Sequence, residues 1–231
     1  MKKIIKKLII LILILFIFIC SYFTYQGYNL YKQALSEISI KEKVTEIKSE
    51  KDNYTLMEDL PQNYIDAVIA VEDRRFYIHN GIDIFSISRA VITNIKKFKL
   101  VEGGSTITQQ LAKNIYFTQK KEITRKIAEG FMAIELEKNL SKDEIFELYV
   151  NTSYFGDGYY CVADASEGYF DKEPKEMDLY ECTLLAGIPN APSVYAPTKN
   201  PDLAKQRQAQ VIKKMVKYKY LTQDEADKIL K

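Results

Sequence analysis

The sequence has few of the residues that build metal sites and covalent cross-links. It contains one histidine, three cysteines and no tryptophan among 231 residues. A zinc site of the usual Cys/His kind needs about four such ligands, so the chain is a poor candidate for one. The cysteines stand among apolar neighbours, which predicts buried free thiols; a Cys161–Cys182 disulfide is the alternative.

Excess positive charge is also lacking beyond the first seven residues. The chain carries 33 basic and 31 acidic residues, a formal net charge of +2. Four of the basic residues are lysines among the first seven residues, where no acid occurs, so the remainder has 29 basic against 31 acidic residues. A nucleic-acid-binding protein needs a basic surface. We therefore expect no nucleic-acid partner.

A long apolar run occurs once, at the N-terminus. Leu8 to Cys20 is wholly apolar, and the residues to Tyr25 extend the run towards the roughly 20 needed to cross a bilayer. Lysines before it and tyrosines after it favour a cytoplasmic N-terminus. A cleaved signal peptide is the alternative, but no small-x-small cleavage site follows. We predict that residues 1–25 form a Lys-rich cytoplasmic tip and an uncleaved transmembrane anchor.

The rest of the chain divides into a linker and a globular part. Residues 26–58 are rich in Lys and Glu, which predicts a helical stalk and then a looser segment, together a solvated spacer. Residues 59–231 form the predicted catalytic domain. Apolar residues recur there with helical periodicity, and no strand-like alternation is long enough to build a sheet. The predicted fold class is all-α.

Helix boundaries follow from capping residues and prolines. We expect N-caps at Asp83, Ser105, Ser141, Asp178 and Thr222. The predicted helices cover residues 61–72, 84–95, 106–114, 122–138, 142–151 and 179–187, with a short last helix. A mobile loop is expected at 115–122, an aromatic turn at 154–160, and an ordered, extended loop where four prolines gather, at Pro189, Pro192, Pro197 and Pro201.

Two glutamates indicate a candidate functional site. The stretch Glu72–Gly81 places adjacent carboxylates, two arginines and the only histidine directly after an apolar helix, where charges are costly unless paired or used. Glu129 lies on an apolar stripe one turn beyond Arg125. That helix alone leaves two interpretations open, a buried Arg125–Glu129 ion pair or a functional carboxylate. A cleft with two carboxylates, amides and several cations suits chemistry at a sugar.

Four motifs occur in order along the chain: Glu72-Asp73-x-x-Phe76-x-x-His79-x-Gly81, Gly104-Ser105-Thr106-Ile107-Thr108-Gln109-Gln110, Arg125-Lys126-x-x-Glu129 and Lys142-x-x-Ile145-x-x-Tyr149-x-Asn151. With these motifs, roughly residues 54–231 resemble the peptidoglycan glycosyltransferases, the transglycosylase domains of class A penicillin-binding proteins and their monofunctional relatives. A fifth family motif normally has two adjacent arginines, but here the second is replaced, as Arg207-Gln208.

The resemblance implies a lysozyme-like helical domain with a smaller membrane-proximal lobe. No Ser-x-x-Lys motif occurs, so the acylating serine of a transpeptidase is absent from this sequence and the protein would be monofunctional. The implied reaction polymerises lipid-linked disaccharide-pentapeptide (lipid II) into β-1,4 glycan, with inversion at the donor anomeric carbon and release of the lipid diphosphate. The implied location is a bacterial cell membrane, with the catalytic domain outside the cytoplasm.

The resemblance also assigns roles to residues. Glu72 would be the general base, and Glu129 would hold cations, a donor group or a divalent ion such as Mg2+ or Mn2+; no cofactor is implied with certainty. His79, Tyr149 and Asn151 are expected to be structural. The implied partners are lipid II, the growing lipid-linked glycan, the membrane and cell-wall transpeptidases. The implied substrate-binding residues are Asp73, Ser105, Thr106, Gln109, Gln110, Lys113, Lys121, Arg125 and Lys126.

Two other functions remain as alternatives. A peptidoglycan hydrolase or lytic transglycosylase shares the lysozyme-like fold and a catalytic glutamate, but cleaving finished glycan involves no diphosphate and gives the cations no task. An inactive membrane-tethered glycan-binding protein is favoured only by the altered fifth motif.

Overall fold

The computed structural model describes residues 2–99, 103–117 and 122–230, and within these ranges it contains helices and no strand. The predicted all-α class is confirmed. Three 3-10 turns, η1 (Met57–Asp59), η2 (Pro174–Glu176) and η3 (Ile188–Asn190), join the longer elements. The α-helices are α1 (Lys2–Glu37), α2 (Ile40–Glu50), α3 (Gln62–Glu72), α4 (Ile84–Lys97), α5 (Ile107–Tyr116), α6 (Ile123–Asn139), α7 (Lys142–Thr152), α8 (Val162–Phe170), α9 (Leu179–Gly187), α10 (Pro192–Tyr195), α11 (Pro201–Lys217) and α12 (Gln223–Ile229).

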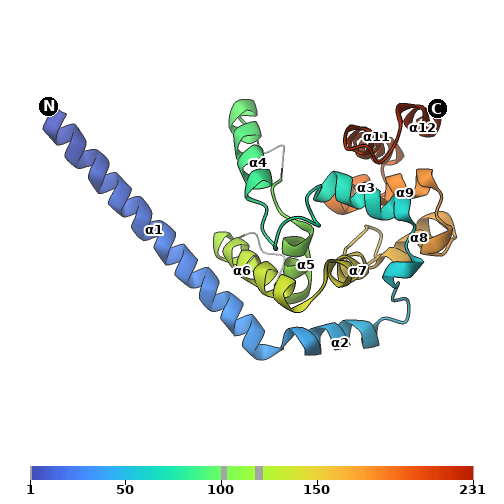
Figure 1. Ribbon diagram of the computed structural model, residues 1–231, viewed down its shortest axis with the longest axis horizontal. Helices are drawn as coiled ribbons and strands as arrows, with labels where there is room; N and C mark the ends of the chain where they lie inside the picture. The colour runs from blue at the N-terminus through green and yellow to red at the C-terminus, as the bar shows by residue number, and fades with distance from the viewer. Residues whose placement is uncertain (1, 100–102, 118–121, 231) are drawn as a thin grey trace.

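The helices form two packed groups with two projections (Figure 1). Helices α5, α6 and α7 pack together, and α3, α9 and α11 form a second group at the end that carries the C-terminus. The N-terminal part of α1 extends from the body as a long rod, and α4 stands apart from both groups. One core runs through the body, and among its fully buried side chains are Tyr64, Phe76, Ile107, Met132, Phe146 and Leu185.

Most of the predicted N-caps are confirmed. The Asp83 carboxylate accepts from the backbone N–H groups of Phe85 and Ser86, and capping boxes begin at Ser141, Asp178 and Thr222. Each of these side chains satisfies a backbone donor that the first helical turn leaves unpaired.

The cap predicted at Ser105 is wrong by one residue. Thr106 caps α5, in a capping box with Gln109, and its hydroxyl also donates to the Gly81 carbonyl at 2.7 Å. That second contact crosses between distant segments, which local sequence does not reveal. The shift leaves the Ser105 side chain for another role.

Two loop predictions also need correction. The proline-rich segment is not extended, because it folds into η3 and α10, and Pro201 opens α11. Proline suits a first helical turn, where its missing N–H has no partner to lose. Of the predicted mobile loop, Ile115 and Tyr116 belong to α5, and residues 118–121 lie outside the described residues.

The stalk is helical as predicted, but the prediction that it is solvated is wrong. Tyr31, Ala34, Ile40 and Ile47 are all at most 8% exposed and join the main core. The chain that follows is held as well, since the Asn151 side chain exchanges two hydrogen bonds with the Thr55 backbone. Residues 31–55 are therefore part of the globular body.

Helix α1 has two contrasting halves. Its stretch from Lys3 is long and apolar enough to cross a membrane, and the large side chains from Ile4 to Ile19 are exposed.

The predicted free thiols are confirmed: Cys161 and Cys182 are buried and unbonded, while Cys20 is exposed on α1. Burial raises the pKa of the Cys182 thiol to about 12, so it stays protonated.

Helix α4 carries a second exposed apolar surface. Phe98, which follows it in a left-handed conformation, is 94% exposed, and Lys96 and Lys97 stand in the last turn. An apolar face of this kind beside basic residues is typical of a helix that lies in a membrane interface. The other exposed apolar side chains here are Ile84, Phe85, Ile87, Val91, Ile92 and Ile95.

We expect protein lacking residues 1–25 to bind vesicles weakly through α4. Replacing Ile95 and Phe98 together by serine removes two large apolar side chains from that face, and should lower vesicle binding by roughly tenfold or more. Flotation with vesicles of anionic lipid measures this. Leu56→Ser is the control, since Leu56 is 43% exposed on another surface; equal losses in both variants would contradict the assignment.

Candidate functional site

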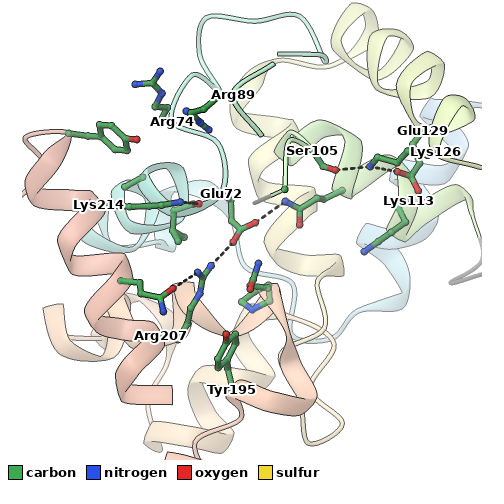
Figure 2. Close-up of a pocket in the computed structure, with 18 of the residues that line it drawn as sticks. Glu72, Arg74, Arg89, Ser105, Lys113, Lys126, Glu129, Tyr195, Arg207 and Lys214 are labelled. Atoms are coloured by element: carbon green, nitrogen blue, oxygen red, sulfur yellow. Dashed lines mark hydrogen bonds and ion pairs between the residues drawn. The ribbon is translucent and has the colours of Figure 1, made fainter. Parts of the chain in front are cut away.

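A basic cavity lies between the two helix groups (Figure 2). It has a volume of about 440 Å³ and is lined by seven arginines and lysines against two glutamates. Glu72 lies near the middle, with Lys113, Lys126 and Glu129 on one side and Arg207 and Lys214 on the other. Such an excess of positive charge suits an anionic ligand.

Glu72 is held from both helix groups. It is the last residue of α3, and its side chain is 10% exposed. The Gln110 amide donates to its Oε2 at 3.0 Å, and the Arg207 guanidinium contacts its Oε1 at 3.3 Å. The carboxylate is thus fixed in position while still reaching the cavity.

Arg207 was not among the predicted site residues. It donates to the Gly187 carbonyl and to the Gln210 side chain, which leaves one nitrogen for Glu72. A Cβ on Gly187 would lie 2.9 Å from the Arg207 Cγ, so glycine leaves the path of this side chain clear. The signal that pointed to Arg207 was the surviving half of the fifth motif.

The altered residue of that motif lies away from the cavity. Gln208 is 2% exposed, and its amide donates to the Tyr180 carbonyl at 2.9 Å and the Thr183 hydroxyl at 3.0 Å. Gln208 therefore fastens α11 to α9. Gln208 is not among the residues that line the cavity, so its departure from the family pattern is no evidence for an inactive protein.

Other basic and aromatic residues of the lining were also missed. Lys214 donates to the Val71 carbonyl at 2.9 Å, and the Arg74 guanidinium stacks 5.4 Å from the centre of the Tyr218 ring. Arg89 and Tyr195 complete this side. They come from four elements that only the fold brings together.

Glu129 lies at the opposite end, and of the two interpretations left open by the sequence the buried ion pair with Arg125 is confirmed, while a functional role of the carboxylate stays a prediction. It is 1% exposed and forms ion pairs with Arg125 at 2.8 Å and Lys126 at 2.7 Å. The Arg125 pair is close but lacks hydrogen-bond alignment. Lys126 also donates to the Ser105 hydroxyl at 2.7 Å, and all four residues line the cavity. The ion pair is therefore part of the site.

Lys113 is the least compensated cation of this end. In the described part of the chain no carboxylate lies within ion-pair distance of it. Burial lowers the pKa of Lys113, and Arg125 and Lys126 lower it further, while Glu129 opposes them. An ammonium kept here without a close partner is destabilising for the fold and attractive for an anion.

We expect Lys113→Met to stabilise the protein and impair its activity. Methionine keeps a flexible apolar stem and removes the buried charge, so the melting temperature should rise by a few degrees. Turnover should fall about tenfold or more, because a cation facing the anionic ligand is lost. Thermal melting and turnover of one preparation decide this. Lys138→Met, at an exposed lysine, should change neither; a lower melting temperature for Lys113→Met would contradict the prediction.

The side chains of three predicted substrate-binding residues form hydrogen bonds within the protein. The Asp73 carboxylate, 4% exposed, accepts from the Ile107 backbone at 3.0 Å and contacts His79 Nε2 at 2.8 Å. The other ring nitrogen of His79 accepts from the Gly81 N–H, so Nε2 carries the proton. Thr106 and Gln109 form the buried α5 cap. We assign these three residues positioning roles in place of substrate contacts.

These contacts build the base of the site. Asp73 binds the first turn of α5, where the helix dipole favours a carboxylate, and α5 carries Gln110 to Glu72. Gly81 adopts φ of +87°, and a Cβ there would lie 2.8 Å from the Ala133 backbone of α6. His79 and Asn151 are structural, as predicted. Lys121, another predicted residue, lies outside the described residues.

A divalent ion near Glu129 does not fit the side chains that surround it. Both Glu129 oxygens already contact cations. Among the described residues, no group of three His, Cys, Asp or Glu side chains is arranged to hold a metal ion. A metal would have to displace Arg125 or Lys126 from Glu129.

Comparisons with known proteins match one family and several relatives. Residues 40–216 match the family described as Transglycosylase. Penicillin-binding protein 1A of Neisseria flavescens is 43% identical over 182 residues, covering 79% of this chain and 23% of that protein. Penicillin-binding protein 1F of Bacillus subtilis is 40% identical over 235 residues, covering 97% of this chain and 33% of that protein. The chain thus spans a third or less of these relatives.

A structural neighbour is a crystal structure of penicillin-binding protein 1A from Haemophilus influenzae. It is 24% identical, with a TM-score of 0.46 over 77% of this chain and 17% of that one.

Proposed function

The chain belongs to the transglycosylase family, and from this premise we propose that it is a peptidoglycan glycosyltransferase that polymerises lipid II into β-1,4 glycan. The observation that carries the proposal is the position of Glu72, a fixed carboxylate in the middle of a cavity rich in cations. This combination matches a reaction that needs a base and releases a diphosphate.

Glu72 acts as the general base. A sugar hydroxyl is a poor nucleophile until its proton is removed. Glu72 takes the proton from the 4-hydroxyl of the acceptor sugar, and the oxygen attacks the anomeric carbon of the donor. The bond from that carbon to the diphosphate breaks on the opposite face, so an α-linked diphosphate becomes a β-1,4 bond.

The cations stabilise the leaving group. The electron pair of the broken bond stays on the diphosphate, where negative charge grows in the transition state. Lys113, Arg125 and Lys126 lie together at one end of the cavity and supply positive charge without needing a proton donor. Glu129 holds Arg125 and Lys126 in place, and Ser105 fixes the Lys126 ammonium.

Positive charge on both sides of Glu72 fits two lipid-linked substrates. Arg74, Arg89 and Lys214 line the side opposite Glu129. The donor and the acceptor each carry a diphosphate, so each side of the base has one anion to hold. A hydrolase acting on finished glycan would meet no diphosphate on either side.

The location follows from the anchor. The chain is membrane-anchored, and α1 is its anchoring helix. Four lysines before the apolar run support a single-pass arrangement with the N-terminus in the cytoplasm and the catalytic domain outside it. The partners are then lipid II, the growing glycan and the membrane, with cell-wall transpeptidases to cross-link the product.

The deciding experiment offers the protein two substrates. We expect polymer from lipid-linked disaccharide in detergent and no cleavage of finished glycan. The polymerisation is run with chelator and with added Mg2+ or Mn2+, and activity in chelator is the expected result. Consumption of finished glycan alone would make the protein a hydrolase, and consumption of neither would favour a binding protein.

A further inference from the structure

Helix α1 packs closely against α6 at Gly27. This glycine is buried, and a Cβ built on it would lie 2.6 Å from Cγ2 and 2.7 Å from Cβ of Ile127. The Thr124 carbonyl would be 3.0 Å away. Glycine inside a helix is destabilising relative to alanine. Its presence within a 36-residue helix is explained by the close contact that it allows.

Aromatic contacts extend this approach along both helices. The Tyr28 and Tyr31 rings lie 5.4 Å and 5.9 Å from the Phe131 ring, and the Tyr31 hydroxyl donates to Glu135 at 3.4 Å. We call the contact of Gly27, Tyr28 and Tyr31 with residues 124–135 the α1–α6 seam. Both helices run in the same direction along it, because later residues of α1 meet later residues of α6.

The seam lies just beyond the predicted membrane anchor. Gly27 is two residues after Tyr25, where that anchor ends, and α1 is unbroken between them. At 1.5 Å per residue this is about 3 Å, within a headgroup layer roughly 5–7 Å thick. Because α6 starts on the membrane side, its first turns, which carry Arg125 and Lys126, lie at this level.

We propose that Gly27 is a positioning residue that seats the membrane anchor on α6 and so holds the Arg125–Lys126–Glu129 cluster level with the diphosphates of membrane-embedded substrates. The inference rests on the proposed function. Helix α1 then holds the cavity in a fixed orientation relative to the bilayer. A lipid-linked diphosphate can bind the cations of the cavity without leaving the membrane interface.

The test is Gly27→Leu in the full chain, reconstituted in vesicles. Leucine favours helix more than glycine does, so the change separates α1 from α6 without weakening α1 itself. Each protein is assayed with a long-chain lipid-linked disaccharide in the bilayer and with a short-chain, water-soluble analogue carrying the same diphosphate. Asn29→Leu is the matched control, because Asn29 lies two residues away on an exposed side of α1.

We expect Gly27→Leu to raise KM for the bilayer substrate about tenfold or more, since a misplacement of about 1 Å can cost a factor of 100. Its kcat and KM for the soluble analogue should stay within about twofold of wild type, which also shows that the fold and the site survive. Asn29→Leu should match wild type on both substrates.

Two results would overturn the proposal. One is unchanged KM for the bilayer substrate in Gly27→Leu. The other is an equal loss on both substrates, which would make the seam a support for α6 rather than for its height above the bilayer. Wild-type protein inactive on both substrates would instead overturn the proposed function on which this inference rests, so the two failures are distinguishable.

Discussion

Glu72→Gln should reduce polymerisation by roughly 100-fold or more, the range expected when a general base is removed. Glutamine has the shape of glutamate and still offers an oxygen to Arg207. Gln110, which donates to Glu72, restores its hydrogen bond by turning its own amide. The substitution therefore removes the proton acceptor and little else. Polymer formed per minute from lipid-linked disaccharide is the measurement.

Donor binding should separate loss of chemistry from loss of fold. The diphosphate is held by the cations at the Glu129 end, so an inert donor analogue should bind Glu72→Gln within a few-fold of wild type. Asp66→Asn, on the same helix and outside the cavity lining, should keep full activity. Wild-type polymerisation by Glu72→Gln would show that Glu72 is not the general base, whereas loss of both binding and turnover would indicate a damaged fold.

Local features of the sequence predicted the helices that open with a Ser, Thr or Asp cap, because capping is local. Helices α8 and α11 were not predicted, and their N-cap residues are Cys161 and an Asn200 whose side chain makes no capping hydrogen bond. Asp83 and Ser141 satisfy backbone groups two or three residues away, so their role is visible in the chain itself. Choosing between Ser105 and Thr106 was different, since both are hydroxyl residues at the start of one apolar run. A contact with the Gly81 carbonyl, 25 positions away, decides for Thr106.

The cavity lining was only partly predictable, for the same physical reason. Glu72 and Glu129 stood out because each interrupts an apolar helical pattern with a charge. Arg207 contacts Glu72 across 135 positions, and nothing in its neighbouring residues or spacing indicates that contact. Among residues from the predicted motifs, burial and internal hydrogen bonds distinguish the positioning residue Asp73 from Ser105, which lines the cavity.

The spacer prediction failed because composition concealed a pattern. Residues 26–58 are rich in Lys and Glu, yet Gly27, Tyr31 and Ala34 lie on one face of α1 at helical spacing and are buried against the body. The charged residues occupy the remaining faces. A helix with one narrow apolar stripe looks solvated when its residues are counted without regard to position.

Glu129→Gln should lower turnover about tenfold or more while leaving the fold intact. Glu129 binds no proton in the proposed reaction; its two oxygens fix Arg125 and Lys126 from a position that is 1% exposed. The oxygen of a neutral amide can accept a hydrogen bond from one of them, but the amide NH2 group faces the other cation with a second donor. The cations then lose their shared anchor, and stabilisation of the leaving diphosphate depends on how well they are positioned.

The pattern of the loss identifies the role of Glu129. Removing a negative charge from a cavity that binds anions does not weaken ground-state attraction, so affinity for an inert donor analogue should stay equal or increase while kcat falls. A merely structural carboxylate would instead lower the melting temperature and leave kcat of the folded fraction unchanged. Glu122→Gln, an exposed residue just before the same helix, controls for the change in charge and should match wild type. If Glu129→Gln turns over normally, Glu129 serves only as the buried partner of Arg125, and Arg125→Ala should then reduce the melting temperature more than the rate.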